Sequence, residues 1–156
     1  MIFKNEKELE QFILKKSRLA LLKAQEEVYK IIKDFIRRFY ADYSPDRYHR
    51  TYQLLQSLVQ SRIVSDGSGY KAEIYFNLDA LSYDGGNPSG EQVMAAASQG
   101  LHGAIGKIPN SKYNSDFQYI PGNSGIGIWD DPVEILDAEA INILKNMLIA
   151  EGIAIK

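Results

Sequence analysis

The chain of 156 residues contains no cysteine. Disulfide bonds, thiolate zinc sites and cysteine nucleophiles are therefore excluded, and redox chemistry gives no clue to its compartment. No apolar run approaches the roughly 20 residues that a membrane-spanning helix needs. The first ten residues are charged and alternate lysine with glutamate, which is unlike a signal peptide. These absences predict a protein that has no contact with a membrane, is made in the cytoplasm, and stays there or is assembled there into something larger.

The chain also lacks a large excess of positive or negative charge, because its formal net charge is only -2. The distribution is nevertheless uneven: residues 4–38 carry ten basic and six acidic side chains, whereas the remainder is acidic. Opposite fields on two parts of one chain favour head-to-tail self-association. The alternative is a solvated helix face with ion pairs four residues apart. The sequence leaves both interpretations open.

Recognisable catalytic, cofactor and metal motifs are absent as well. The histidines, His49 and His102, lie in separate segments, and neither has the spacing of a zinc site. Residues 122–127 (GNSGIG) lack the Lys-Ser/Thr pair of a phosphate loop. Acidic residues near the start of the last predicted helix suit its positive end, namely Asp130, Asp131, Glu134 and Asp137. We therefore expect no enzyme activity, cofactor or metal; a hydrolase using His102 is the catalytic alternative.

A long N-terminal helix is the strongest positive signal. Residues 6–40 contain neither glycine nor proline, and Asn5 with Glu8 forms a capping-box-like start. Apolar residues recur at a spacing near 3.6, namely Leu9, Ile13, Ala20, Ala24, Val28, Ile31, Phe35 and Phe39. A helix over residues 6–41 would be roughly 50 Å long, so it either projects or is broken near its middle. Its basic residues are spread around the circumference, which argues against DNA binding by an isolated copy.

Shorter elements follow. The pattern predicts a helix over residues 50–59 and a hairpin of strands 61–65 and 70–77, in which Ala72, Ile74 and Phe76 alternate with polar or exposed positions. A helix over residues 90–101 precedes a long loop, residues 103–128. A last helix opens with Asp131 as N-cap and Pro132 as first residue, and ends before Gly152. Residues 153–155 fit a short strand. The prediction is a single α+β domain over residues 1–156, in which the long N-terminal helix and the C-terminal helix pack on a small antiparallel sheet.

Residues 48–58 (YHRTYQLLQSL) add a resemblance to this pattern. Together with the long charged helix, the hairpin end at residues 74–77 (IYFN) and the later Gly-x-His-Gly at residues 100–103, this segment resembles small neck proteins of long-tailed bacteriophages. These are tail-completion or head–tail joining proteins, also called minor tail components in phages and prophages. The resemblance covers residues 8–103 in order of elements, and the final helix also fits.

The resemblance implies a structural virion protein without enzyme activity or cofactor. It implies a homo-oligomeric ring, typically of six copies, between the connector or stopper and the tail tube or terminator, through which DNA would pass without specific binding. The interface residues expected on this basis are Arg47, Tyr48, Arg50, Thr51, Tyr113, Phe117 and Tyr119. Arg50 and Thr51 would hold the junction between helix and hairpin, and the loop over residues 103–128 would become ordered on a partner. A tail terminator and a non-viral helical adaptor, which would form a dimer through the long helix, are the alternatives.

Overall fold

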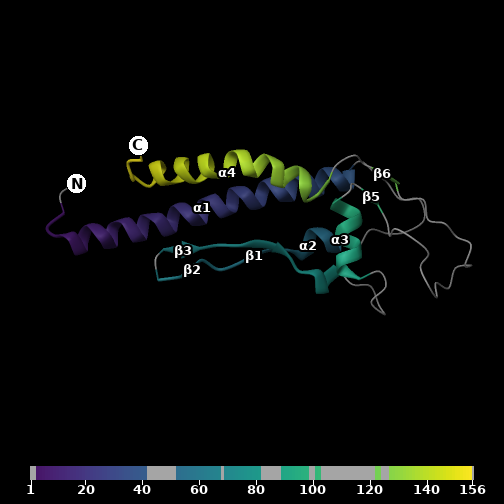
Figure 1. The fold of residues 1–156 in the computed structure, drawn as a ribbon, viewed down its shortest axis with the longest axis horizontal. Helices are drawn as coiled ribbons and strands as arrows, with labels where there is room; N and C mark the ends of the chain where they lie inside the picture. The colour runs from purple at the N-terminus through teal and green to yellow at the C-terminus, as the bar shows by residue number, and fades with distance from the viewer. Residues whose placement is uncertain are drawn as a thin grey trace, which may run out of the picture. The chain divides into compact units, whose positions relative to one another are not determined.

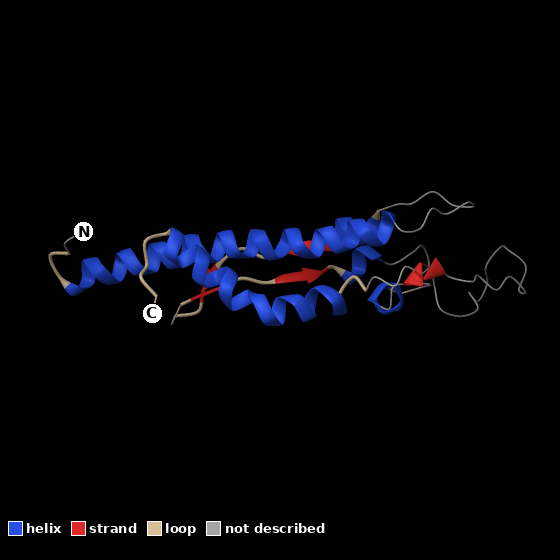
Figure 2. Cartoon of the chain, turned by 90° about the horizontal axis from the view of Figure 1, so that it is seen from above, coloured by secondary structure: helices blue, strands red, loops and turns tan. Residues whose placement is uncertain are grey.

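The computed structural model describes residues 3–41, 52–67, 69–81, 89–98, 101–102, 122–123 and 127–155. The predicted α+β class is confirmed, since long N- and C-terminal helices accompany short antiparallel strand pairs (Figure 1). Figure 2 shows the same elements from above. In chain order the elements are α1 (Glu6–Ala41), α2 (Gln53–Ser57), β1 (Leu58–Gln60), β2 (Val64–Ser65), β3 (Tyr70–Lys71), β4 (Ile74–Phe76), η1 (Leu78–Leu81), α3 (Gly90–Ser98), β5 (Leu101–His102), β6 (Gly122–Asn123) and α4 (Asp130–Ala150).

Helix α1 begins at the predicted cap and continues without a break to Ala41. The Asn5 side-chain oxygen accepts the backbone N–H of Glu8 at 2.9 Å. The Glu8 carboxylate in turn accepts the backbone N–H of Lys4 at 2.8 Å. The N–H of Glu8, which the helix itself leaves without an acceptor, is thereby satisfied, and the N–H of Lys4 just before the cap also gains a partner.

The hairpin is present, but its boundaries differ from the prediction. Strand β1 pairs with β4, and β2 pairs with β3 through Val64 opposite Lys71 and Ser65 opposite Tyr70. The helix predicted over residues 50–59 is wrong at its end, because α2 stops at Ser57 and Leu58 takes an extended backbone with ψ 119°. Pairing with a strand distant in sequence overrides the local helical pattern there.

The two strand pairs of the hairpin are separated at Ser61 and Glu73. The backbone N–H of Ser61 donates to the Glu73 carbonyl at 2.8 Å, as a regular ladder requires. The backbone N–H of Glu73 donates instead to the Ser61 hydroxyl, also at 2.8 Å. A side chain thus replaces one backbone acceptor, and the ladder is interrupted at this point. The predicted turn after β2 is closed by the Gly69 N–H on the Asp66 carboxylate at 2.8 Å.

The second half of the chain differs from the prediction in three places. Helix α3 ends at Ser98, and Leu101 belongs to β5, which pairs antiparallel with β6 inside the stretch expected to be a loop. Helix α4 begins at Asp130, so Asp131 lies in the first turn, where its carboxylate accepts the Gly127 N–H at 2.9 Å. Residues 153–155 form no strand. Strands of two residues produce no periodicity, which is why the sequence did not reveal β5 and β6.

The C-terminus of α4 closes as a Schellman motif. Gly152 has φ 86°, its N–H donates to the Ile149 carbonyl at 2.9 Å, and the Ile153 N–H donates to the Leu148 carbonyl at 3.0 Å. Only glycine adopts this left-handed conformation without steric cost. The predicted end of the last helix before Gly152 is confirmed.

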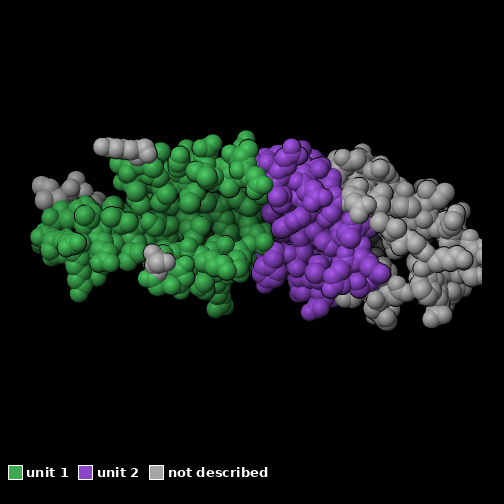
Figure 3. Space-filling view, viewed as in Figure 1, with its two compact units in different colours: residues 1–30, 60–74, 136–156 green, residues 31–59, 75–135 purple. Residues whose placement is uncertain are grey.

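The chain divides into two compact units, coloured separately in Figure 3. Unit 1 comprises residues 1–30, 60–74 and 136–156. In it, α1 contacts both the C-terminal end of α4 and the hairpin, and the small side chains of Ala20 and Ala24 are buried. Small residues permit a close approach of backbones, which suits the positions where α1 meets the other elements of unit 1.

Unit 2 comprises residues 31–59 and 75–135. Its described core is larger and more aliphatic: it contains Ile32, Ile36, Phe39, Leu54, Leu58, Leu81, Ala96, Ala97 and Ile128. The rings of Phe76 and Trp129 meet edge to face with centroids 5.6 Å apart. Gly90 lets α3 approach η1, because a Cβ there would lie 2.0 Å from the Leu78 carbonyl oxygen. Volume and backbone geometry are therefore both constrained in this unit.

Candidate interaction surfaces

The seven interface residues predicted from the sequence lie outside the described residues. Arg47, Tyr48, Arg50 and Thr51 fall within residues 42–51, and the other three fall within residues 103–121. Their assignment to an interface stays a prediction. The described neighbours of the first group are the end of α1 and the start of α2, and these carry a feature that the sequence did not reveal.

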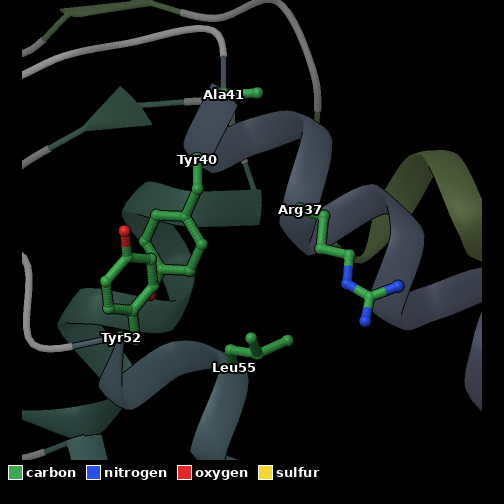
Figure 4. A pocket seen from close by; sticks show the side chains of 5 residues that line it. All are labelled: Arg37, Tyr40, Ala41, Tyr52 and Leu55. Atoms are coloured by element: carbon green, nitrogen blue, oxygen red, sulfur yellow. The ribbon is translucent and has the colours of Figure 1, made fainter.

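A shallow pocket of about 260 Å³ lies in unit 2, between the last turn of α1 and the start of α2 (Figure 4). Its lining residues are Arg37, Tyr40, Ala41, Tyr52 and Leu55. The two tyrosine rings meet edge to face with centroids 5.1 Å apart. The guanidinium of Arg37 is directed away from the rings and donates to Asp34 at 3.1 Å. The pocket is therefore an apolar and aromatic surface rather than a charged one.

Tyr52 adopts an unusual backbone conformation at this pocket. It has φ 56° and ψ 20°, and no side-chain hydrogen bond caps α2 from it. A left-handed conformation costs a residue with a Cβ about 1–2 kcal/mol. The contact with Tyr40 offsets part of this cost, since aromatic pairs contribute about 0.5–1.5 kcal/mol beyond their buried area. Only the fold brings these two rings together.

An ion-paired carboxylate joins the two helices of unit 1. The Glu151 carboxylate, whose side chain is nearly buried, accepts hydrogen bonds from the ammonium groups of Lys23 and Lys16, the latter at 2.9 Å. The hydrogen bond from Lys23 is the largest cause that lowers the pKa of Glu151 below its ordinary value, followed by the bond from Lys16. This contact holds the end of α4 against α1.

A buried amide joins α1 to the hairpin. Gln25 is 7% exposed, and its side-chain nitrogen donates to the carbonyl oxygens of Ser61 at 3.1 Å and Glu73 at 3.0 Å. These are the residues at which the strand ladder is interrupted. The amide supplies a donor to a carbonyl that the strands leave free, which satisfies the rule that buried polar groups find partners.

Two helix faces of unit 1 expose large aliphatic side chains. On α1, Leu9 is 39% exposed and Ile13 is 43% exposed. On α4, Ile141 is 67% exposed and Ile149 is 56% exposed. Contiguous apolar area on a surface marks protein contacts more often than isolated exposed residues do. These faces are the best candidates for interaction surfaces among the described residues.

Other kinds of site find no support in the described part of the chain. It contains no group of three or more histidine, cysteine, aspartate or glutamate side chains placed to hold a metal ion. None of its helices combines the length and the apolar character needed to cross a membrane. His49 and the side chain of His102 lie outside the described residues, so the alternative of a hydrolase using His102 stays a prediction.

Comparison with known proteins places the chain in a family. The family model YomN matches residues 5–146. This chain belongs to the YomN family. No curated protein and no solved structure matches it.

The YomN match extends over both units. It includes the whole of α1, the pocket at Tyr40 and Tyr52, and all seven interface residues predicted from the sequence. It ends inside α4 at residue 146, so Glu151 and the Schellman motif of this YomN chain lie beyond it. Leu9 and Ile13 of α1 and Ile141 of α4 thus fall within the family region, and Ile149 falls just outside.

Proposed function

We propose that this protein is a structural virion protein of the phage head–tail interface, a tail-completion or neck protein. Copies would be made in the cytoplasm of the host and would form a ring, of six subunits, that joins the tail to the connector. Its partners would be further copies of itself, the connector or stopper, and tail-tube or terminator proteins. A ring in this position allows DNA to pass without a sequence-specific contact.

The observation that carries this proposal is the exposed apolar area on α1 and α4 of unit 1. Four large aliphatic side chains on these helices are between 39% and 67% exposed, namely Leu9, Ile13, Ile141 and Ile149. Assembly proteins need such faces, because burial of apolar area supplies most of the free energy of association.

Two further observations support the phage context. The YomN family takes its name from a gene in a prophage region of Bacillus. The segment at residues 48–58 and the order of the elements resemble phage neck proteins. The head–tail position itself depends on that resemblance, so the experiment must examine it directly.

The experiment is reconstitution with phage tail parts. The mass of the purified chain is first measured by light scattering after size exclusion over a wide concentration range, and any large species is imaged by negative stain. The chain is then mixed with connector and tail-tube proteins of a phage that encodes a YomN protein. We expect rings of several subunits, formed alone or on the partner. A chain that forms no ring and binds neither partner would contradict the proposal.

The result also separates the alternatives. A stable dimer that a peptide of α1 alone reproduces would favour the helical adaptor. Rings that bind only the free end of the tail tube would favour a tail terminator. Rings that bridge tube and connector would favour tail completion.

A further inference from the structure

The N-terminal turns of α1 extend past the elements that pack against the rest of it. We name residues 6–15 the α1 overhang. In both Figure 1 and Figure 2 it begins beyond the C-terminal end of α4 and beyond the β2–β3 turn. Ten residues of helix correspond to a length of roughly 15 Å. The overhang is therefore a projecting arm of unit 1.

The apolar face of this arm continues the buried face of α1. Leu9 and Ile13 follow the same helical stripe as Ala20, which is 0% exposed. A helix of 3.6 residues per turn places positions 9, 13 and 20 within a narrow arc. The stripe is thus buried where α4 and the hairpin cover it and exposed on the overhang. Glu6 and Glu10 lie along one edge of this exposed stretch, and neither forms an ion pair with another described residue.

The second unpartnered surface is the α4 outer face, formed by Ile141, Lys145 and Ile149. These residues are spaced four apart, so they lie on one side of the helix over about 12 Å. Lys145 is the only charged side chain in residues 140–150, and no described acidic group pairs with it. The face therefore consists of two exposed isoleucines on either side of one free ammonium group.

We infer that the α1 overhang of one copy docks on the α4 outer face of a second copy. The two surfaces have similar lengths, and each exposes large aliphatic side chains. Their charges are opposite, since Glu6 and Glu10 border the overhang and Lys145 lies at the centre of the α4 outer face. Burial of the aliphatic side chains supplies the affinity, and the charges fix the register.

Charge also selects this contact over a symmetric one. Two α4 outer faces paired antiparallel, with Ile141 against Ile149, would place one Lys145 opposite the other. Like charges in direct opposition are unfavourable. A contact between unlike faces leaves the pair of copies with one free overhang and one free α4 outer face, which is the condition for a closed ring or an open filament. This inference rests on the proposed ring-forming function and names the contact that would build the ring.

The test uses two complementary variants of the full chain. One carries Leu9→Asp and Ile13→Asp and loses the overhang surface. The other carries Ile141→Asp and Ile149→Asp and loses the α4 outer face. Because all four side chains are exposed, we expect both variants to fold, which circular dichroism and thermal melting check. Val64→Asp is the matched control, because Val64 is exposed on β2 of the same unit.

We expect each variant to be monomeric alone and the mixture to form heterodimers of one to one. Each variant supplies the surface that the other has lost, so one contact forms and no chain can grow further. The Val64→Asp control should assemble like the unmodified chain. Assembly of either variant alone, or failure of the mixture to associate, would overturn the inference. Rings of the unmodified chain would in that case leave the proposed function standing with another interface.

Charge reversal tests the register separately. Lys145→Glu should weaken self-association about tenfold. Combination of Lys145→Glu with Glu10→Lys in one chain should restore most of the loss, as measured by sedimentation. Loss without recovery would contradict the predicted pairing. An unmodified chain that remains monomeric at every soluble concentration would overturn this contact, whereas the proposed function is then judged by incorporation into tails.

Discussion

Gln25 offers the sharpest test of how unit 1 is held together. We expect Gln25→Met to destabilise the protein, because methionine keeps the volume and the helix propensity of glutamine but cannot donate a hydrogen bond. The variant removes the bonds to the Ser61 and Glu73 carbonyls, at 3.1 and 3.0 Å. Each such bond contributes a net 0.5–1.5 kcal/mol, so the loss of two gives about 1–3 kcal/mol.

The lower half of this range is expected. The Glu73 carbonyl keeps the N–H of Ser61 at 2.8 Å, so only the Ser61 carbonyl loses its described donor. Ser61 is partly exposed, which lets water replace the amide. The expected loss is therefore about 1–2 kcal/mol, which corresponds to a decrease in Tm of roughly 2–8 °C for a chain of this size.

The assay is urea unfolding followed by circular dichroism, with thermal melts in parallel. Gln11→Met is the matched control, because Gln11 is exposed on the same helix and should change stability by less than about 0.5 kcal/mol. Gln25→Glu provides a second check: its carboxylate would face two carbonyl oxygens at neutral pH, and protonation in acid would restore one donor. If Gln25→Met is as stable as Gln11→Met, the amide does not hold α1 to the hairpin and the reasoning is refuted.

Three further predictions concern single positions. Glu151→Gln should lower Tm at neutral pH. The pKa of Glu151 in the folded protein lies below its ordinary value of 4.5. The difference in Tm between the variant and the unmodified chain should therefore persist above pH 4.5 and shrink as the pH falls below it. Thermal melts at several pH values measure this difference. Gly90→Ala should lower the free energy of unfolding by about 1–3 kcal/mol, because its Cβ would collide with the Leu78 carbonyl. Gly69→Ala is the control and should lower it less, because a Cβ there meets nothing within 4 Å. Equal urea midpoints for the two variants would contradict this prediction. Gly152→Ala should cost about 1 kcal/mol through its φ of 86° alone, and an unchanged urea midpoint would show that the Schellman motif does not stabilise α4.

Local signals predicted the helices and their ends better than the strands. The cap at Asn5, the turn closed by Asp66 and Gly69, and the helix end before Gly152 are all present as the sequence indicates. Each depends on a few consecutive residues whose side chains bind the neighbouring backbone. The predicted end of the second helix was wrong because the leucines near it suit a helix as well as a strand. The pairing of β1 with β4 decides between them.

The candidate surfaces likewise depend partly on the local sequence and partly on contacts between distant residues. The sequence by itself determined that α1 carries a continuous apolar stripe, since helical periodicity is a property of consecutive residues. Only the tertiary structure decided that this stripe is buried at Ala20 and exposed at Leu9, because burial depends on where α4 and the hairpin end. It also decided that Gln25 reaches two carbonyls of the hairpin and that Tyr40 meets Tyr52. Contacts between residues far apart in the chain have no local signal, and the fold alone brings such residues together.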